Sequence, residues 1–276
     1  MALPWLDFAV RHLRPRWVRN ALADSFQGFE RYALPAVLER PPGARVLVLA
    51  PHPDDESIGC GGSIQRLVQA GVPVRVCFLT DGAQGDPALR ALAASSAARR
   101  SGEAALVGRR RAEARAALTV LGVAQHDFFD APDGGLGDAV DTLAPKLAAV
   151  LDDWRPDTVL LPFLTDRHPD HHAASHCLAA AVQRTGEARA PDTCLGFELW
   201  SPILANVVVD IGGCLDIKRR AIACHASQLK DVDYWQAVEG LNRYRAVSAL
   251  LPGGHAEAFH QSGWAAYRRL LARSRV

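Results

Sequence analysis

The sequence lacks the features that would direct the chain to a membrane or a nucleic acid. Its formal net charge is only +1 at neutral pH, so overall charge provides no general attraction to polyanions. No apolar run reaches the roughly 18 residues that a membrane-spanning helix needs. Residues 1–20 carry several arginines without a clean apolar stretch or a small-residue cleavage site, which argues against a signal peptide. We therefore expect no stable membrane insertion and no nucleic-acid partner.

Several common sequence signatures are absent as well. The six cysteines form no C-x-x-C pair and most lie in apolar surroundings, which predicts reduced core thiols in a cytoplasmic protein. There is no G-x-S-x-G, Walker or H-E-x-x-H sequence. The glycine-rich segment 59–62 lacks G-x-G-x-x-G spacing, and three carboxylates precede it where a pyrophosphate would have to lie. These absences argue against the serine hydrolases, zinc proteases and nucleotide-binding proteins that carry such signatures.

The sequence does contain an alternation of strand-like and helix-like segments. With 276 residues, 49% hydrophobic and 22% charged, the chain can bury a full core and has the composition of a soluble enzyme. Apolar runs predict strands at 46–50, 74–80, 126–129 and 158–163, and the segments between or after them predict helices at 61–70, 109–121, 140–153 and 170–184. This order predicts an α/β fold, a Rossmann-like, mostly parallel sheet with helices on both faces.

The ends of the chain and one insertion are less regular. We expect residues 1–43 to form a helical N-terminal extension, amphipathic to about residue 38, and 44–276 to form a single domain. Segments 195–200 and 206–211 resemble edge strands, possibly antiparallel, and helices are expected near 215–226 and 256–273. Residues 83–108 have weak periodicity and are either a lid over the strand ends or a surface excursion.

Histidine and carboxylates follow the first apolar strand. His52 is bracketed by prolines, and Asp54, Asp55 and Glu56 come directly after it. Ligands of open α/β sheets bind at the carboxyl ends of the strands, and burying this much charge without a cation would be costly. His52 and Asp55 are three residues apart in a turn and can converge on one cation. Asp54 points elsewhere and is free for another role.

A second cluster follows the strand expected at 158–163, and it predicts a metal site at the same sheet edge. Pro169 suits the first turn of a helix and keeps His168 out of helical conformation, so His171 lies in the first turn. His52, Asp55 and His171 then make the three-ligand set of a catalytic zinc site, although the same set also suits Fe²⁺. Asp54 and His168 remain as base and acid for hydrolysing an amide or ester.

Each part of this site has a plainer interpretation. The H-P-D-D turn could simply begin a helix, with an aspartate capping it. His172 and His176 lie four residues apart on one helix face and form a rival metal pair, but no third ligand of matching spacing is evident. We interpret these two histidines as ordinary helix-surface or site-wall residues.

The paired motifs resemble those of the PIG-L/LmbE family of metal-dependent N-deacetylases. A-P-H-P-D-D-E at residues 50–56 and H-P-D-H at 168–171 are similar to the two family motifs. Further similarity runs through T-D-G at 80–82, R-x-x-E at 110–113, Lys218 and H-x-S-Q at 225–228, so the resemblance covers about residues 44–265.

The resemblance implies roles for individual residues. His52, Asp55 and His171 would hold Zn²⁺ or another divalent metal, Asp54 would be the general base, and His168 would stabilise the oxyanion or protonate the leaving amine. Two further residues, Arg110 and Asp133, would bind substrate, although Arg110 could instead pair with Glu113 on its own helix. Three acidic residues would support the site without holding the metal: Glu56, Asp81 and Asp170.

The resemblance also implies a substrate class. Members of the family remove acetyl from N-acetylglucosamine-type groups of small-molecule glycoconjugates, through a zinc-bound water. Two alternatives stay open: the same site acting on longer-chain or lipid-linked N-acyl substrates, and a metal-dependent protein that binds acylated sugars without hydrolysing them. The extension and the C-terminal segment also offer surfaces for a homo-oligomer.

Overall fold

The architecture is a single mixed sheet with helices on both faces. The computed structural model describes residues 34–230, 232–251 and 254–274. Its eight-stranded sheet has the order β1-β7-β8-β6-β5-β2-β3-β4, and only the pairings of β8 with β6 and β7 are antiparallel. The strands are β1 Ala36–Leu38, β2 Val46–Ala50, β3 Val74–Thr80, β4 Gln125–Ala131, β5 Thr158–Pro162, β6 Thr193–Phe197, β7 Val207–Asp210 and β8 Ala256–Gly263. The predicted α/β class is confirmed.

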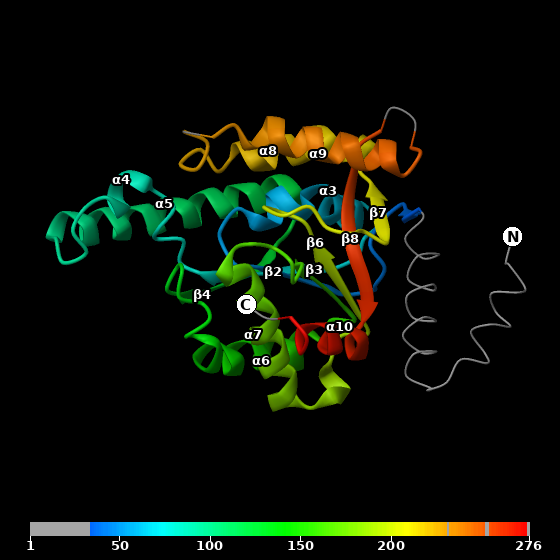
Figure 1. Ribbon diagram of the computed structural model, residues 1–276, viewed down its shortest axis with the longest axis horizontal. Helices are drawn as coiled ribbons and strands as arrows, with labels where there is room; N and C mark the ends of the chain where they lie inside the picture. The colour runs from blue at the N-terminus through cyan, green and yellow to red at the C-terminus, as the bar shows by residue number, and fades with distance from the viewer. Residues whose placement is uncertain (1–33, 231, 252–253, 275–276) are drawn as a thin grey trace, which may run out of the picture.

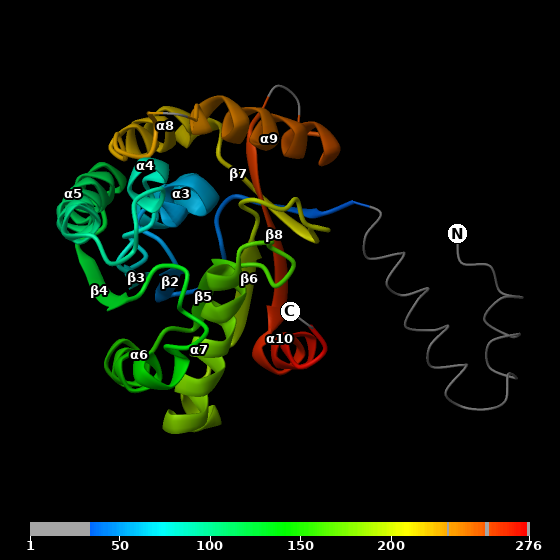
Figure 2. The same cartoon turned by 60° about the vertical axis from the view of Figure 1, so that its left-hand side comes forward.

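Two helical layers cover the sheet (Figures 1 and 2). One layer contains α3 Asp55–Gln69, α5 Ala97–Leu121, α8 Leu215–Ala223 and α9 Tyr234–Ser248. The other contains α6 Val140–Trp154, α7 Pro169–Thr185 and α10 Trp264–Leu271. A short helix, α4 Pro87–Arg90, precedes α5.

Strand β2 shows why this sequence requires cover on both faces. All five residues of its V-L-V-L-A run are buried. Leu47 and Leu49 join the core under α6 and α7, while Val46, Val48 and Ala50 join the core under α3 and α5. A strand buried on both faces has a continuous apolar run, which is typical of parallel sheets.

The position of β2 in the sheet creates the site. Strand β2 pairs with β3 on one side and with β5 on the other, both in parallel. The chain therefore continues to β3 and β4 in one direction and later to β5 and β6 in the other. The crevice at such a switch point, beyond the carboxyl ends of the strands, is where open α/β sheets bind ligands.

Several sequence predictions differ from the structure. Segment 256–273, expected as one helix, is strand β8 followed by α10. Residues 36–38, expected at the end of the helical extension, form β1 and pair with β7. Residues 97–108, placed in the irregular segment 83–108, are the first half of α5. The remaining part of the predicted extension, residues 1–33, lies outside the described residues.

The two late strands are also not at the edges. Strand β6 lies between β5 and β8, and β7 lies between β1 and β8; the edges are β1 and β4. The misplacement has a simple cause, because β8 was not foreseen as the strand that separates them. In the part of the chain that the structure covers, no helix is long and apolar enough to cross a membrane.

Candidate active site

Three ligand atoms meet at the ends of β2 and β5. His52 Nδ1 lies 3.2 Å from Asp55 Oδ2, His171 Nε2 lies 3.4 Å from the same oxygen, and the two nitrogens are 3.3 Å apart. Zinc bound at about 2.0–2.1 Å in tetrahedral geometry separates its ligand atoms by about 3.3–3.4 Å. The predicted ligand set is therefore brought together with the spacing that a zinc ion fits.

Local backbone structure explains how these side chains are presented. The backbone N–H of His52 donates to Asp55 Oδ2 at 2.8 Å, which closes the turn between β2 and α3. At the second segment His168 is the N-cap of α7 in extended conformation, and Pro169 is the first helical residue. His171 then lies in the first turn, as predicted from the H-P-D-H spacing.

A carboxylate lies behind each of the two histidines of this set. His52 Nε2 is 3.2 Å from Asp170 Oδ2 and 3.2 Å from Asp133 Oδ1, and His171 Nδ1 is 3.1 Å from Asp166 Oδ1. Asp170 is the hydrogen-bond partner of His52 Nε2, while Asp133 and Asp166 lie at ion-pair distance from His52 Nε2 and His171 Nδ1. A proton on each of these outward-facing nitrogens leaves the other ring nitrogen with its lone pair toward the predicted metal position. Such carboxylate–histidine pairs orient metal ligands and raise their basicity.

When no cation is bound, the surrounding aspartates determine the pKa values of His52 and His171. Burial lowers the pKa of His171, but Asp55 and Asp166 outweigh burial and raise the pKa to about 9. The pKa of His52 is likewise well above its ordinary value, because its hydrogen bonds to three aspartates exceed the effect of burial. A divalent cation would supply the charge that protons otherwise provide here, so binding it would release protons.

Other metal groupings in the described chain share His52. One joins His52 with His168 and His171, and the other joins it with Asp133 and Asp170. The second grouping uses His52 Nε2, and its carboxylates already accept backbone hydrogen bonds. Both carboxylates thus lie behind His52, and Asp133, predicted to bind substrate, also lines the cavity.

Asp54 faces Arg110, which reaches the site from α5. Arg110 Nη2 lies 3.1 Å from Asp54 Oδ2, and its Nη1 donates to Gly82 O at 2.9 Å. Burial raises the pKa of Asp54 and the charge of Asp55 adds to this, while the Arg110 guanidinium opposes both. A carboxyl group whose pKa is raised toward neutrality is better suited to accept a proton and return it.

Two glycines make room for Arg110. A Cβ at Gly82 or Gly85 would lie 2.8 or 2.6 Å from Arg110 Nη1, closer than any real contact, and Gly82 also has a positive φ of 68°. The alternative pairing of Arg110 with Glu113 does not occur, because Glu113 accepts hydrogen bonds from the backbone and side chain of Ser227.

The remaining acidic residues support this arrangement. Asp81 Oδ1 accepts from the backbone of Ala83 at 3.0 Å and of Asp133 at 3.2 Å, which fixes the loop carrying Asp133. Glu56 lies in the first turn of α3, where its Oε1 accepts from Ser57 Oγ at 2.6 Å and lies 3.5 Å from His225 Nε2. Neither residue lines the pocket.

Sequence reasoning missed one residue near the site. Asp166 was assigned no role, although a carboxylate two residues before His168 was a readable signal. His172 Nε2 lies 2.9 Å from Ser274 Oγ near the C-terminal end, and its ring is next to His176. In the described ranges, neither belongs to a metal-capable group.

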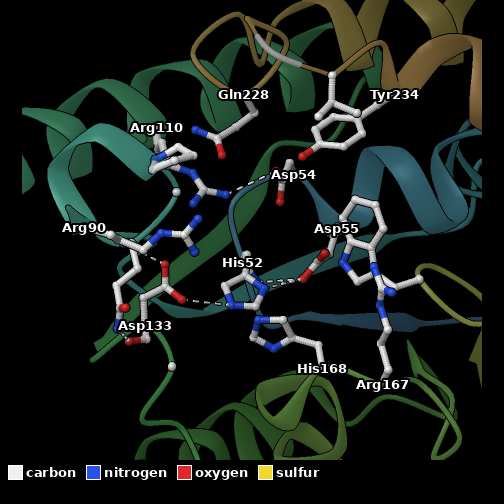
Figure 3. A pocket seen from close by; sticks show the side chains of 16 residues that line it. His52, Asp54, Asp55, Arg90, Arg110, Asp133, Arg167, His168, Gln228 and Tyr234 are labelled. Carbon is white, nitrogen blue, oxygen red and sulfur yellow. Dashed lines mark hydrogen bonds and ion pairs between the residues drawn. The ribbon is translucent and has the colours of Figure 1, made fainter.

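His52, Asp54, Asp55 and His168 lie at the floor of a cavity of about 600 Å³ (Figure 3). Its sides come from the loop after β3, from α4, from the 167–168 turn, and from the segments around Trp200, Gln228 and Tyr234. The lining residues are His52, Asp54, Asp55, Gln84, Gly85, Pro87, Arg90, Arg110, Asp133, Gly134, Arg167, His168, Trp200, Gln228, Val232 and Tyr234. The space accommodates a small molecule above the predicted metal ligands.

Comparison with known proteins identifies the family. Residues 47–182 match the PIG-L family model, described as GlcNAc-PI de-N-acetylase. The chain is 30% identical over 271 residues to the 1D-myo-inositol 2-acetamido-2-deoxy-alpha-D-glucopyranoside deacetylase of Actinosynnema mirum, covering 79% of this chain and 92% of that protein. The chain belongs to the PIG-L family.

Two other proteins that are similar to this chain have different activities. The diacetylchitobiose deacetylase of Thermococcus kodakarensis is 29% identical over 227 residues, covering 76% of this chain and 79% of that protein. The crystal structure of GalB, the 4-carboxy-2-hydroxymuconate hydratase of Pseudomonas putida KT2440, superposes with a TM-score of 0.62 at 25% identity, covering 79% and 95% of the two chains. The PIG-L fold thus carries both deacetylases and a hydratase.

Proposed function

We propose that this protein is a metal-dependent amide hydrolase that removes acetyl from the N-acetylglucosamine-type moiety of a small-molecule glycoconjugate. The observation that carries the proposal is the meeting of His52 Nδ1, Asp55 Oδ2 and His171 Nε2 at 3.2–3.4 Å, with Asp54 and His168 lining the cavity beside them. The deacetylase names of its relatives from Actinosynnema mirum and Thermococcus kodakarensis support the acyl group and the amino sugar.

Zinc is the cation that we propose for the three ligands, with Fe²⁺ or another divalent metal as alternatives. Two imidazoles and one carboxylate, each histidine oriented by a carboxylate, are a typical catalytic set with open positions. When bound, such an ion polarises an amide carbonyl and lowers the pKa of water, which supplies the nucleophile near neutral pH.

Asp54 is the proposed general base. Its carboxylate takes a proton from the attacking water as the water oxygen bonds to the amide carbon. Arg110, 3.1 Å away, holds the carboxylate in place and neutralises its charge. The raised pKa of Asp54 makes its carboxylate a stronger base, and the carboxylic acid that forms passes its proton to the departing nitrogen, which is more basic still.

His168 is the proposed oxyanion donor. Its Nδ1 accepts from the backbone N–H of Asp170 at 3.2 Å, so in the neutral ring the proton is on Nε2. Burial, together with the positive charges of His52 and His171, lowers the pKa of His168 and favours that neutral form. A neutral N–H in the cavity can stabilise the negative oxygen of the tetrahedral state, and such preorganised donors contribute much of an enzyme's rate.

Acetate release from a panel of N-acetylglucosamine conjugates tests the proposal. Purified protein is assayed as prepared, after chelation, and after restoring one zinc equivalent. Zinc-dependent acetate release supports the proposal. Longer acids released in preference to acetate would favour the long-chain alternative, and zinc-loaded protein that binds but never hydrolyses would favour a binding role.

Asp54→Asn separates chemistry from metal binding. The substitution removes the base without touching the three ligand atoms, so we expect full zinc content and a turnover roughly 10²- to 10⁴-fold lower. Metal analysis and initial rates check both parts. Near-normal turnover would show that Asp54 is not the base.

A further inference from the structure

Two arginines at the mouth of the cavity are not used by the proposed reaction. Arg90, at the end of α4, and Arg167, directly before His168, both line the cavity. Figure 3 shows them on opposite sides of His52. Within the described ranges, neither guanidinium forms an ion pair or hydrogen bond. Two cations therefore face the same small space without a partner.

The carboxylates that line the cavity are already engaged. Asp54 pairs with Arg110, Asp55 lies against His52 and His171, and Asp133 contacts His52 and the backbone of Gln84. These three are the acidic residues of the cavity lining. The mouth thus carries an excess of positive charge above a floor whose acids are committed to the proposed reaction.

Some other arginines of the described chain do have carboxylate partners. Ion pairs are formed by Arg75, Arg99, Arg110, Arg111, Arg189, Arg245 and Arg268. Arg110 also lines the cavity but is paired with Asp54, whereas Arg90 and Arg167 line it without an ion pair to any described residue. Guanidinium groups bind carboxylate and phosphate through paired N–H donors, so an unpaired pair at a pocket mouth suits an anionic ligand.

The backbone holds both arginines in place. The N–H of Arg167 donates to Ser201 Oγ at 3.1 Å, and the preceding Asp166 accepts from the backbone of Trp200 at 2.8 Å. Helix α4 is capped by Asp86, which accepts from Ala88 N at 2.8 Å. The charges are therefore presented from anchored segments of the rim.

The same rim offers an apolar surface. The rings of Trp200 and Tyr234 pack edge to face with centroids 5.3 Å apart, and both residues line the cavity. Aromatic rings at a pocket mouth pack against the C–H faces of a ligand ring. The rim can thus contact a sugar ring while arginines reach a group attached to it.

We propose that the substrate carries an anionic group, a carboxylate or a phosphate, on the part attached to its N-acetylated sugar, and that Arg90 and Arg167 bind this group. The inference rests on the proposed function, because it takes the acetamide to lie at Asp54 and His168. It narrows the substrate class to acidic glycoconjugates.

Three matched glycosides of N-acetylglucosamine test this inference: 2-hydroxyethyl, which is neutral, carboxymethyl, and 2-phosphoethyl. We expect kcat/KM for one of the acidic glycosides to exceed that of the neutral one by roughly tenfold, with the difference reduced at high salt. The acidic glycoside that is preferred distinguishes a carboxylate from a phosphate. Equal kcat/KM for all three glycosides would overturn the inference.

Variants then assign the effect to the two arginines. Arg90→Gln and Arg167→Gln should each raise KM for the acidic glycoside roughly fivefold and leave the neutral glycoside within about twofold. Arg90→Lys and Arg167→Lys should recover part of the loss. The control is Arg184→Gln on α7, which does not line the cavity. An equal rise in KM for the neutral glycoside would overturn the inference, since it would indicate that the arginines only shape the cavity and do not bind an anionic group.

The two proposals can fail separately. Acetate release from the neutral glycoside without any charge preference would keep the proposed function and overturn this inference. If no glycoside releases acetate, the proposed function fails, and calorimetric binding of the same three compounds still decides: equal affinities overturn the inference, and arginine-dependent binding of an acidic compound supports it.

Discussion

Asp170→Asn tests whether the carboxylate behind His52 controls metal binding. Asp170 is 1% exposed and accepts three hydrogen bonds. Its Oδ2 faces His52 Nε2 at 3.2 Å and Gly134 N at 2.7 Å, and its Oδ1 faces Leu136 N at 3.1 Å. Asparagine has the same shape but replaces one acceptor oxygen with an N–H₂ group.

The magnitude follows from these three donors. In the less costly orientation the new N–H₂ faces Leu136 N, which leaves that buried N–H without an acceptor at a cost of about 1–3 kcal/mol. The bond from His52 Nε2 also loses its charged acceptor, so His52 is held less firmly in the tautomer that binds metal. We expect the free energy of unfolding to fall by about 2 kcal/mol and zinc affinity to fall by roughly 10- to 100-fold.

Zinc affinity is measured by competition with a chromogenic chelator, and stability of the metal-free protein by urea denaturation. The control is Asp138→Asn at an exposed position, where both quantities should match the unsubstituted protein. Zinc affinity within twofold of the unsubstituted value would refute the assignment of Asp170 as the residue that orients His52.

Three further outcomes are expected. Chelation should abolish acetate release and lower the unfolding temperature. An ion that binds only the folded state stabilises it, by about 2.7 kcal/mol when the free ion concentration is a hundred times its Kd. An unchanged unfolding temperature after chelation would contradict a metal buried at this site. Lys218→Met removes the cation that lies 2.6 Å from the fully buried Glu257, and the free energy of unfolding in urea should fall by about 3–5 kcal/mol. The exposed control Lys230→Met should change the free energy of unfolding by less than about 0.5 kcal/mol. Similar losses for both variants would refute the buried-pair argument. Asp166→Asn should weaken zinc binding roughly tenfold, and unchanged binding in chelator competition would show that His171 does not depend on it.

Much of the fold was predictable because the central strands have unambiguous patterns. Val46–Ala50 and Thr158–Pro162 are buried throughout, and such continuous apolar runs bounded by turns indicate strands of a parallel sheet. Strand β8 was mistaken for helix because its sequence, A-E-A-F-H-Q-S-G, has no β-branched residue and two alanines. Its structure comes from antiparallel pairing with β6 and β7 on both sides, and tertiary pairing often overrides weak local preference.

The sequence by itself determined which side chains could form the metal centre. The Pro-bracketed His52 with Asp55, and His171 in the first turn of a helix that begins at Pro169, have their geometry set by local backbone constraints, which short-range sequence encodes. The partners of these residues were decided by tertiary structure alone. Arg110 beside Asp54 and the two unpaired arginines of the rim depend on how separate segments meet above the sheet, and no local sequence pattern specifies these contacts.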